Sequence, residues 1–534
     1  MTRLLPFGLI LIFAISFVLA LMTGQHLPGW MVVGGGIATP LALLGTYDVI
    51  QRRHALWRNF PILAHIRWIA EELRPFFRSY IVENDTEGRP FNHEQRALVY
   101  RRAKNVSSVE PFGSLLDIDK PPYEWLAHSI AAKHTAGDCP RVRVGAPGTT
   151  QPYSASVFNI SAMSFGSLGA HAIEALSTGA KMGDFYHDTG EGGVSPHHRA
   201  GGADLVWEIG SGYFGCRAQD GTFDAARFAD VANDPQIKMI EIKLSQGAKP
   251  GHGGVLPGAK VTAEIAATRG IPIGETCFSP PGHSAFSTPI EMMEFVARLR
   301  DLSGGKPVGI KFCVGNRWEI LALCKAMLET GIRTDFMVVD GGEGGTGAAP
   351  AEFLDHIGAP LRQGLILTRN ALIGTGLKDH VRLACSGKQT SAFALASSMA
   401  LGADWVNTAR GFMFSLGCIQ SLNCHNNTCP TGIATTDKGR QRGLVVADKA
   451  ERVCNFHRNT VKALMEVVGA AGCEHPAELT PRHIMHRVTE DIALPAHRAY
   501  DLLEKNALLD APGDTKLADE WSMAQAASFR PLSL

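Results

Sequence analysis

Eight short apolar segments, each ending in a turn rich in Gly, Ser or Asp, constrain the fold of this chain most. Stretches with helical spacing, such as 290–302 and 319–330, separate several of them. The segments are 157–164, 185–188, 206–211, 239–244, 308–312, 336–340, 382–386 and 405–408. Eight strands alternating with helices over about 250 residues predict an α/β fold, a (β/α)8 TIM barrel. An open doubly wound sheet is the competing topology, but polar motifs follow nearly every strand, as expected when eight loops converge on one face.

Two apolar runs near the N-terminus approach the length of membrane-spanning helices. Residues 4–22 carry no charge, and residues 30–50 carry one, on Asp48. A secretory signal peptide is the alternative, but the first run is long for one and a second run follows at once. Basic residues follow the second run and the connector has no Lys or Arg, so the positive-inside rule places both ends in the cytoplasm. The sequence predicts a transmembrane helical hairpin over 1–50 in the inner membrane, with a cytoplasmic catalytic domain.

Three further parts follow the predicted hairpin. Helical spacing predicts a helical segment over 51–135, the barrel domain occupies 136–475, and a helical extension covers 476–534. The 51 basic and 51 acidic side chains balance, so nothing in the charge indicates a nucleic-acid partner.

Three of the eleven cysteines lie on one short loop. Cys418, Cys424 and Cys429 have the spacing C-x5-C-x4-C, and Pro430 follows the last. Soft thiolates this close together suit an iron–sulfur cluster, either one that lacks an iron or a four-iron cluster with an outside ligand. Three core cysteines are the alternative, because free Cys is often buried. The other eight have no ligand-like spacing and are expected to be structural.

Turns after the last two predicted strands indicate a phosphate site. Backbone N–H groups on such loops form the phosphate cradle of many barrels, although ordinary turns have a similar composition. The residues concerned are Ser386, Gly387, Lys388, Arg410 and Gly411. Residues 342–347 spell G-x-G-x-x-G, but Pro350 follows where a dinucleotide-binding helix would run, which argues against a Rossmann site.

Motifs between about residues 155 and 460 resemble the FMN-binding synthase domain of glutamate synthases. They stand in that family's order at 161–167, 189–193, 211–215, 242–251, 256–258, 340–348 and 417–435. The resemblance implies FMN as a cofactor and a 3Fe–4S cluster on the cysteine loop that passes electrons to FMN. It also implies reductive amination of 2-oxoglutarate to L-glutamate through 2-iminoglutarate.

Cofactor-binding residues are expected at two strand ends. Ala162, Met163 and Ser164, after the first strand, are placed to meet the polar edge of a flavin. Gln246 follows the fourth strand and is expected on the same side.

Four charged residues are the catalytic candidates. Lys243 and Lys249 are placed to stabilise a reduced flavin and to hold a substrate carboxylate. Glu191 is placed to hydrogen-bond an imine or amine nitrogen. Lys311 is a further cation that is expected to bind either the reduced flavin or a substrate carboxylate. For each of them, a structural ion pair in a polar barrel mouth is the alternative.

The chain departs from the family pattern at His252, Tyr213 and the stretch 280–286, which leaves the substrate open. No amidotransferase or FAD/NADPH module is evident, so the expected partners are ferredoxin or a reductase subunit and a separate ammonia-supplying subunit. Two other functions stay open. One is a membrane-anchored flavin dehydrogenase that oxidises an amine or N-alkyl amino acid and reduces a quinone or ferredoxin; the other is a non-catalytic electron-transfer subunit.

Overall fold

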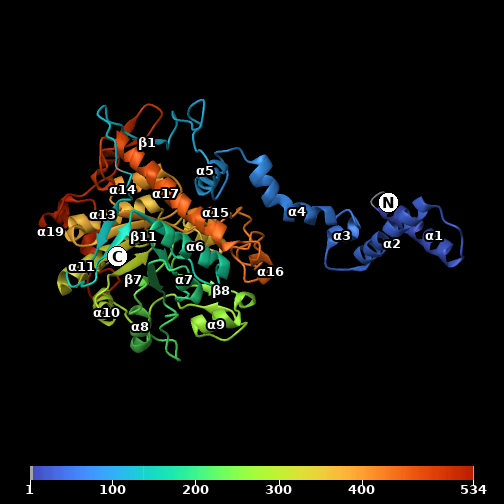
Figure 1. Ribbon diagram of the computed structural model, residues 1–534, viewed down its shortest axis with the longest axis horizontal. Helices are drawn as coiled ribbons and strands as arrows, with labels where there is room; N and C mark the ends of the chain where they lie inside the picture. The colour runs from blue at the N-terminus through green and yellow to red at the C-terminus, as the bar shows by residue number, and fades with distance from the viewer. Residues whose placement is uncertain (1–3, 136, 533–534) are drawn as a thin grey trace. The chain divides into compact units, whose positions relative to one another are not determined.

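The computed structural model describes residues 4–135 and 137–532, which belong to two compact units (Figure 1). The first unit is Met1–Asn84 and the second is Asp85–Leu534. Residue 136, the expected start of the barrel domain, lies outside the described residues, as do the first three residues of the expected hairpin.

The first unit begins with two long apolar helices, α1 (Leu5–Met22) and α2 (Gly29–Ile50). Glycines let them approach closely, since a Cβ at Gly35 would lie 2.0 Å from the Phe17 ring and one at Gly45 would lie 2.4 Å from the Phe7 ring. By length and composition, both helices are able to cross a membrane.

The chain after α2 folds back onto the end of that helix. Buried Asp48 accepts a hydrogen bond from the Ile62 N–H at 2.9 Å and lies 3.0 Å from His65 Nε2. The remaining elements of this unit are α3 (Ala55–Asn59), α4 (His65–Phe77) and the π-helix η2 (Arg78–Val82).

Eight parallel strands of the second unit close into a barrel, so the predicted TIM barrel is confirmed. In chain order they are β4 (Phe158–Ile160), β5 (His187–Asp188), β6 (Leu205–Ile209), β7 (Ile237–Lys243), β10 (Val308–Phe312), β11 (Phe336–Asp340), β12 (Arg382–Ser386) and β13 (Trp405–Thr408). Val406 of the last strand pairs with Phe158 of the first, and this pairing excludes the open doubly wound sheet.

Helices surround the barrel (Figure 1). The longer ones are α5 (His93–Ala103), α6 (Ala170–Gly183), α10 (Pro289–Leu302), α11 (Arg317–Thr330), α13 (Leu361–Gly374), α14 (Ala392–Ala400) and α17 (Val446–Ala470). Shorter ones are α7 (Pro196–Ala200), α8 (Ala225–Ala232), α9 (Ala263–Arg269), α12 (Ala351–His356), α15 (Arg410–Ser415), α16 (Lys438–Gln441), α18 (Ala496–Ala499), α19 (Ala507–Asp510) and α20 (Ala518–Met523), with 3-10 turns η3 (Gly258–Lys260), η4 (Leu377–Asp379), η5 (Pro476–Glu478) and η6 (Pro512–Asp514). Helices α10 and α11 match the predicted ones, and Thr288 and Glu291 form a capping box that begins α10.

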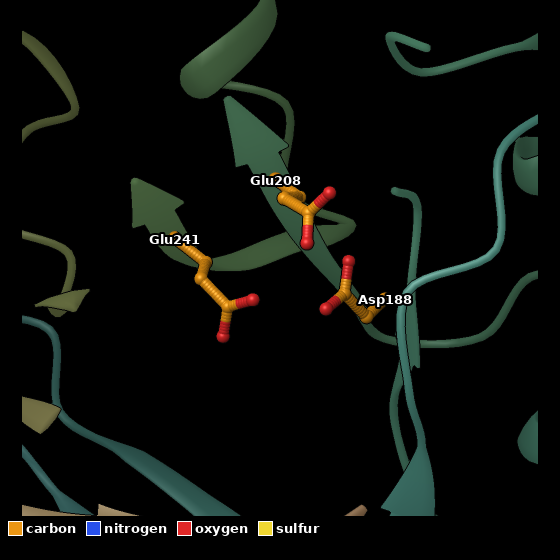
Figure 2. Close-up of side chains that lie close together, drawn as sticks. All are labelled: Asp188, Glu208 and Glu241. Atoms are coloured by element: carbon orange, nitrogen blue, oxygen red, sulfur yellow. The ribbon is translucent and has the colours of Figure 1, made fainter. Parts of the chain in front are cut away.

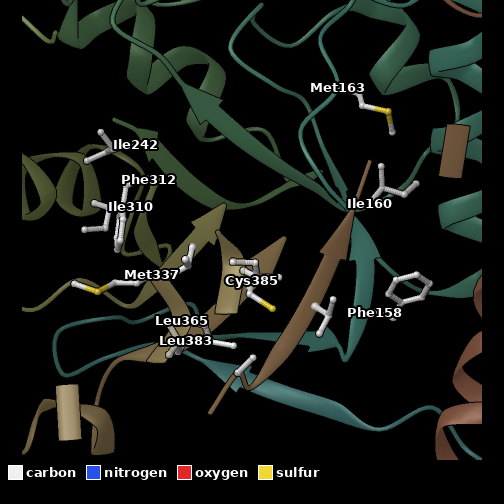
Figure 3. Close-up of a cluster of buried hydrophobic side chains, with 14 of the residues drawn as sticks. Phe158, Ile160, Met163, Ile242, Ile310, Phe312, Met337, Leu365, Leu383 and Cys385 are labelled. Atoms are coloured by element: carbon white, nitrogen blue, oxygen red, sulfur yellow. The ribbon is translucent and has the colours of Figure 1, made fainter. Parts of the chain in front are cut away.

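The core forms where barrel strands and helices meet. Side chains that point out of the barrel, among them Ile242, Ile310, Met337 and Leu383, pack with Leu365 of α13 (Figure 3). Side chains that point inward at the amino end of the strands form a separate apolar cluster: Tyr186, Val206, Met239, Phe336, Val338, Ala384 and Trp405. The hairpin of β2 (Arg141–Val144) and β3 (Tyr153–Ser156) adds Val144 and Ala155 to this cluster, so it closes the amino end of the barrel.

The segments before and after the barrel are less helical than expected. Residues 106–123 carry no helix, and β1 (Glu124–Leu126) pairs with β14 (Ile484–Arg487), which pairs with β15 (Ala493–Pro495). Prolines at 111, 121, 122, 481 and 495 interrupt helical backbone in both segments. A small antiparallel sheet therefore stands where helical extensions were predicted.

Candidate active site

A hollow opens at the carboxyl ends of the barrel strands, and we call it the central hollow. The loops after β4, β5, β7, β11 and β13 line it, together with part of the cysteine loop. Barrel enzymes place their active sites at this face, because the carboxyl ends of all eight strands meet there. Lys243, Lys249, Glu191 and Gln246 all line the central hollow.

Lys243 and Glu191 form an ion pair inside the central hollow. Lys243 Nζ lies 3.0 Å from Glu191 Oε1, and both side chains are largely buried. Burial raises the pKa of Glu191, but the charge and hydrogen bond of Lys243, with smaller effects from Lys249 and Arg269, outweigh it and lower that pKa. Glu191 is therefore a carboxylate held among cations.

Lys249 is a buried cation with no carboxylate within 4.0 Å among the described residues. Burial lowers its pKa to about 8; the charge of Glu191 opposes this effect and that of Lys243 adds to it. An ammonium group with little neutralisation in a hollow is suited to bind an anion from solution.

Backbone and amide groups of the expected flavin residues lie on the same hollow. Ala162, Met163 and Ser164 line it after β4. Gln246 Nε2 donates to Thr346 Oγ1 at 3.4 Å, which places the amide against the loop after β11. The structure thus brings these four predicted residues together.

The residues of the predicted phosphate turns do not all line the central hollow; some line a second hollow, which the cysteine loop also lines. Arg410 lines both hollows, and its Nη2 donates to the Thr346 carbonyl at 2.6 Å. Lys388 lines only the second hollow. Ser386, Gly387 and Gly411 line neither; Ser386 Oγ instead donates to Asp340 Oδ1 at 2.5 Å.

The glycine-rich segment 342–347 lines the second hollow and, through Gly345–Gly347, the central one. A Cβ at Gly345 would lie 2.5 Å from Arg410 Nε, so a larger residue there would displace the Arg410 side chain. The sequence argues against a Rossmann site, and we assigned this segment no role from it. The family motif at 340–348 was the signal that could have identified the segment as part of the site. Its backbone and Arg410 together suit a phosphate.

The three loop cysteines line the second hollow, which we call the cysteine hollow, and Cys424 lines both hollows. Among the described residues, the three sulfurs do not all lie within 4.8 Å of one another. A tetrahedral zinc site with Zn–S bonds of about 2.3 Å needs sulfurs roughly 3.8 Å apart, so the spacing does not suit a single ion. Three soft thiols that line one hollow remain a ligand set that suits an iron–sulfur cluster.

The local environment of the cysteines suits thiolate ligands in part. Hydrogen bonds from Thr431 and from backbone near Ala434 outweigh burial and lower the pKa of Cys429. Burial raises the pKa of Cys418 to about 11, as expected before a metal replaces the thiol proton. Positive φ angles of 55°, 60° and 65° at Gln420, Leu422 and Asn427 wrap the loop tightly.

Lys260 is a site residue that no sequence pattern indicated. Only 2% of it is exposed, and Nζ donates to the carbonyls of Ser167 and Cys424, each at 3.0 Å. It lines the central hollow beside the cysteine loop. Lys260 belongs to none of the sequence motifs, so only the fold reveals that it lies in the site.

Lys311 does not line the central hollow. It is 3% exposed inside the barrel, and Nζ lies 2.6 Å from Glu208 Oε2 and 3.8 Å from Glu241 Oε1. The structural ion pair, left open as the alternative at the sequence level, is the arrangement found. The carboxylates that pair with Lys311 come from neighbouring strands, and no local pattern predicts them.

Two departures from the family pattern contact each other. The Tyr213 hydroxyl lies 3.2 Å from His283 Nδ1 and accepts from the Ala285 N–H at 3.0 Å. His283 Nε2 donates to the carbonyl of Lys243 at 2.8 Å. The pair therefore supports the strand end that carries Lys243. The third departure, His252, packs edge-on against Phe353 with ring centroids 5.1 Å apart.

Residues 148–474 match the model of a protein family, described as the conserved region in glutamate synthase. The chain belongs to this family, and its class is that of glutamate synthase-like oxidoreductases. The resemblance in the sequence motifs is confirmed.

Two glutamate synthase relatives agree with this family membership, and a solved flavoprotein structure is a distant neighbour. The glutamate synthase large subunit-like protein YerD of Bacillus subtilis is 36% identical over 497 residues, which cover 85% of this chain and 94% of that protein. The archaeal-type glutamate synthase (NADPH) of Thermotoga neapolitana is 31% identical over 312 residues, 58% of each chain, so this chain spans just over half of that relative. The flavin-binding domain of baker's yeast flavocytochrome b2 is 14% identical with a TM-score of 0.40, over 73% of this chain and 78% of that one.

Proposed function

We propose that this protein is a membrane-anchored FMN and 3Fe–4S oxidoreductase that converts 2-oxoglutarate and ammonia to L-glutamate. The observation that carries the proposal is the meeting of Lys243, Glu191 and Lys249 with the cysteine loop at one hollow. Electrons from ferredoxin or a reductase subunit would enter at the cysteine loop. Cys424 lines both hollows, so an electron path between the two sites would be short.

The residues of the central hollow fit a flavin. Its backbone segments at Ala162–Ser164, the Gln246 amide and the cation of Lys243 suit the polar edge of the ring, and Arg410 with the glycine-rich segment suits the phosphate. When bound, FMN would supply hydride transfer, which no side chain of this chain can perform. The cysteine hollow offers three thiols, which are the soft ligands that an iron–sulfur cluster takes.

The substrate would lie between Lys249 and Glu191. Lys249 pairs with a substrate carboxylate, because its ammonium has no protein carboxylate within 4.0 Å in the described chain. Glu191, held ionised by Lys243, accepts hydrogen bonds from the imine or amine nitrogen. Together these groups would act as a clamp that orients the reacting carbon of the substrate toward the bound flavin.

Lys311 has no place in this clamp. Its ammonium already pairs with Glu208 and is buried within the barrel. The proposed clamp therefore consists of Lys243, Lys249 and Glu191.

The rate should fall on the alkaline side as Lys249 loses its proton. Because the pKa of Lys249 in the free protein is about 8, kcat/KM for 2-oxoglutarate should decline as pH rises through about 8. A pH–rate profile of the holoenzyme measures this. In Lys249→Arg, the guanidinium keeps its proton, so any remaining activity should lose the decline. An identical alkaline decline in wild type and Lys249→Arg would contradict the assignment.

Replacing Arg410 with glutamate should release most of the flavin, because a carboxylate would then face the phosphate. Heat-released cofactor, quantified by chromatography, should be FMN in wild type and nearly absent from Arg410→Glu. Arg442→Glu, an exposed position outside both hollows, is the matched control and should keep its flavin. FAD in the wild type, or full FMN content in Arg410→Glu, would overturn this part.

The two N-terminal helices are proposed as a membrane hairpin with the catalytic unit in the cytoplasm. Deleting residues 1–50 should yield a soluble, flavin-loaded protein, because both long apolar helices are then gone. Deleting only residues 1–27 leaves α2 and should keep the protein in the membrane fraction. Labelling of a C-terminal tag from outside intact cells would contradict the cytoplasmic orientation.

A further inference from the structure

Three carboxylic acids and one lysine meet inside the barrel. Asp188 ends β5, Glu208 lies on β6, Glu241 on β7 and Lys311 on β10, which are four consecutive strands of the barrel. The three carboxyl groups point toward one another (Figure 2), with one oxygen of each within 4.8 Å of the others. We call these four residues the acid cluster. It lies between the apolar cluster at the amino end and the central hollow, which Glu208 also lines.

The acid cluster has too little positive charge for three ionised carboxylates. Asp188, Glu208 and Glu241 are each at most 2% exposed, and Lys311 is the cation that pairs with them, 2.6 Å from Glu208. Tyr186 and Asp340 also act on the cluster, and neither brings a positive charge. A surplus of two negative charges at this depth is unstable unless protons bind.

The geometry identifies where a proton resides. An oxygen of Asp188 lies within 4.8 Å of an oxygen of Glu241, a separation at which two ionised carboxylates repel each other in a buried site. Glu241 Oε1 is buried and accepts no hydrogen bond from any donor in the described chain, whereas Asp188 accepts one from the Gly190 N–H at 3.0 Å. Glu241 is therefore the carboxyl of the pair to which we assign the proton, and Asp188 is the neighbouring carboxylate.

The electrostatics agree with this assignment. Burial, followed by the charge of Asp188, raises the pKa of Glu241 well above its usual value. Burial, followed by the charge of Glu208, raises the pKa of Asp188 to about 7. Two carboxyls that share a proton behave in this way, since like charges side by side do not both ionise.

A metal ion is the competing occupant of three clustered carboxylates. Lys311 argues against it, because its ammonium already stands 2.6 Å from Glu208 and 3.8 Å from Glu241, where a divalent cation would bind. A second cation beside this ammonium would be repelled in a low-dielectric interior.

We propose that the Asp188–Glu241 pair holds one proton near neutral pH and delivers it through Glu208 to the central hollow. In this step the O–H bond of the pair breaks and an O–H bond forms on Glu208, while Lys311, 3.8 Å from Glu241 Oε1, faces the carboxylate left behind. Glu208 then passes the proton to the group that gains negative charge in the hollow, and the pair takes up a proton from solvent before the next cycle, which restores the charge of the cluster. The delivery rests on the proposed redox function of the hollow, whereas the holding of the proton does not.

Infrared spectroscopy of the holoprotein near neutral pH tests the proposal. Wild type should show the C=O stretch of a protonated carboxylic acid, shifted in heavy water and lost in Glu241→Gln. Glu264→Gln, at a half-exposed side chain, is the matched control and should keep the band. On reduction of the bound cofactor with dithionite, the band should weaken in wild type and stay unchanged in Glu208→Gln.

Several results would overturn the proposal. A wild-type spectrum without a carboxylic-acid band, which needs no variant to fold, would exclude the held proton. A stoichiometric divalent metal other than iron, lost in Glu241→Gln, would replace the proton by an ion. A carboxylic-acid band that does not change when the wild-type cofactor is reduced would exclude delivery of the proton to the hollow. Glutamate formation by a protein without the band would refute this inference alone, and a band in a protein that makes no glutamate would refute the proposed reaction alone.

Discussion

Replacing Lys249 with alanine is expected to lower the rate of glutamate formation about 30- to 1,000-fold, which corresponds to roughly 2–4 kcal/mol of transition-state binding. The ammonium lies in the central hollow without a carboxylate within 4.0 Å among the described residues, so the substrate would be its main partner. Steady-state kinetics of the holoenzyme measures the loss. Flavin and iron contents should stay at wild-type levels, because Lys249 holds neither cofactor in this account.

Lys238→Ala provides the matched control for Lys249→Ala. Lys238 lies on the same strand, β7, but faces Asp204 at 3.6 Å and is partly exposed. Its loss should leave the rate unchanged. Full activity of the Lys249→Ala variant would contradict the proposed clamp.

Changing Cys418, Cys424 or Cys429 to serine is expected to remove most iron and acid-labile sulfide. Each variant should also lose the broad visible absorbance beyond the flavin bands, because hard serine oxygen is a poor ligand for such a cluster. Iron and sulfide assays on protein purified without oxygen measure this. Cys454→Ser, a buried cysteine on α17, should keep both.

Wild-type protein that is iron-free after anaerobic purification would contradict the cluster. The loop would then be structural, with its left-handed residues serving only to shape the wall of the cysteine hollow.

The barrel was predictable because its signals are local. Each strand is a short apolar run with a turn at its end, and each predicted helix has its own periodicity. The exact ends of the strands were less predictable. The expected segment 185–188 is a strand only at His187–Asp188, because pairing with β4 and β6 decides where the strand begins. The sheet of β1, β14 and β15 was not predictable, because it joins residues more than 350 positions apart.

Residues of the site also differ in how far the sequence predicts their roles. Lys243 and Lys311 are register partners on β7 and β10; Lys243 is the last residue of its strand and Lys311 the last but one, so their sequence contexts are alike. Their partners differ: Glu191 reaches Lys243 from a loop, whereas Glu208 reaches Lys311 across the barrel interior. Only the closed barrel reveals that one lysine faces the hollow and the other neutralises buried acids.

Formation of L-glutamate by the purified holoprotein tests the central claim most directly. Supplied with reduced ferredoxin, ammonium and 2-oxoglutarate, wild type should produce glutamate and recolour its bleached flavin, and omission of either ammonium or 2-oxoglutarate should stop both. If no glutamate forms and an amine or N-alkyl amino acid bleaches the oxidised flavin instead, the account is contradicted and the protein is an amine dehydrogenase. If neither set of reagents changes the flavin, the chain is an electron-transfer subunit without turnover.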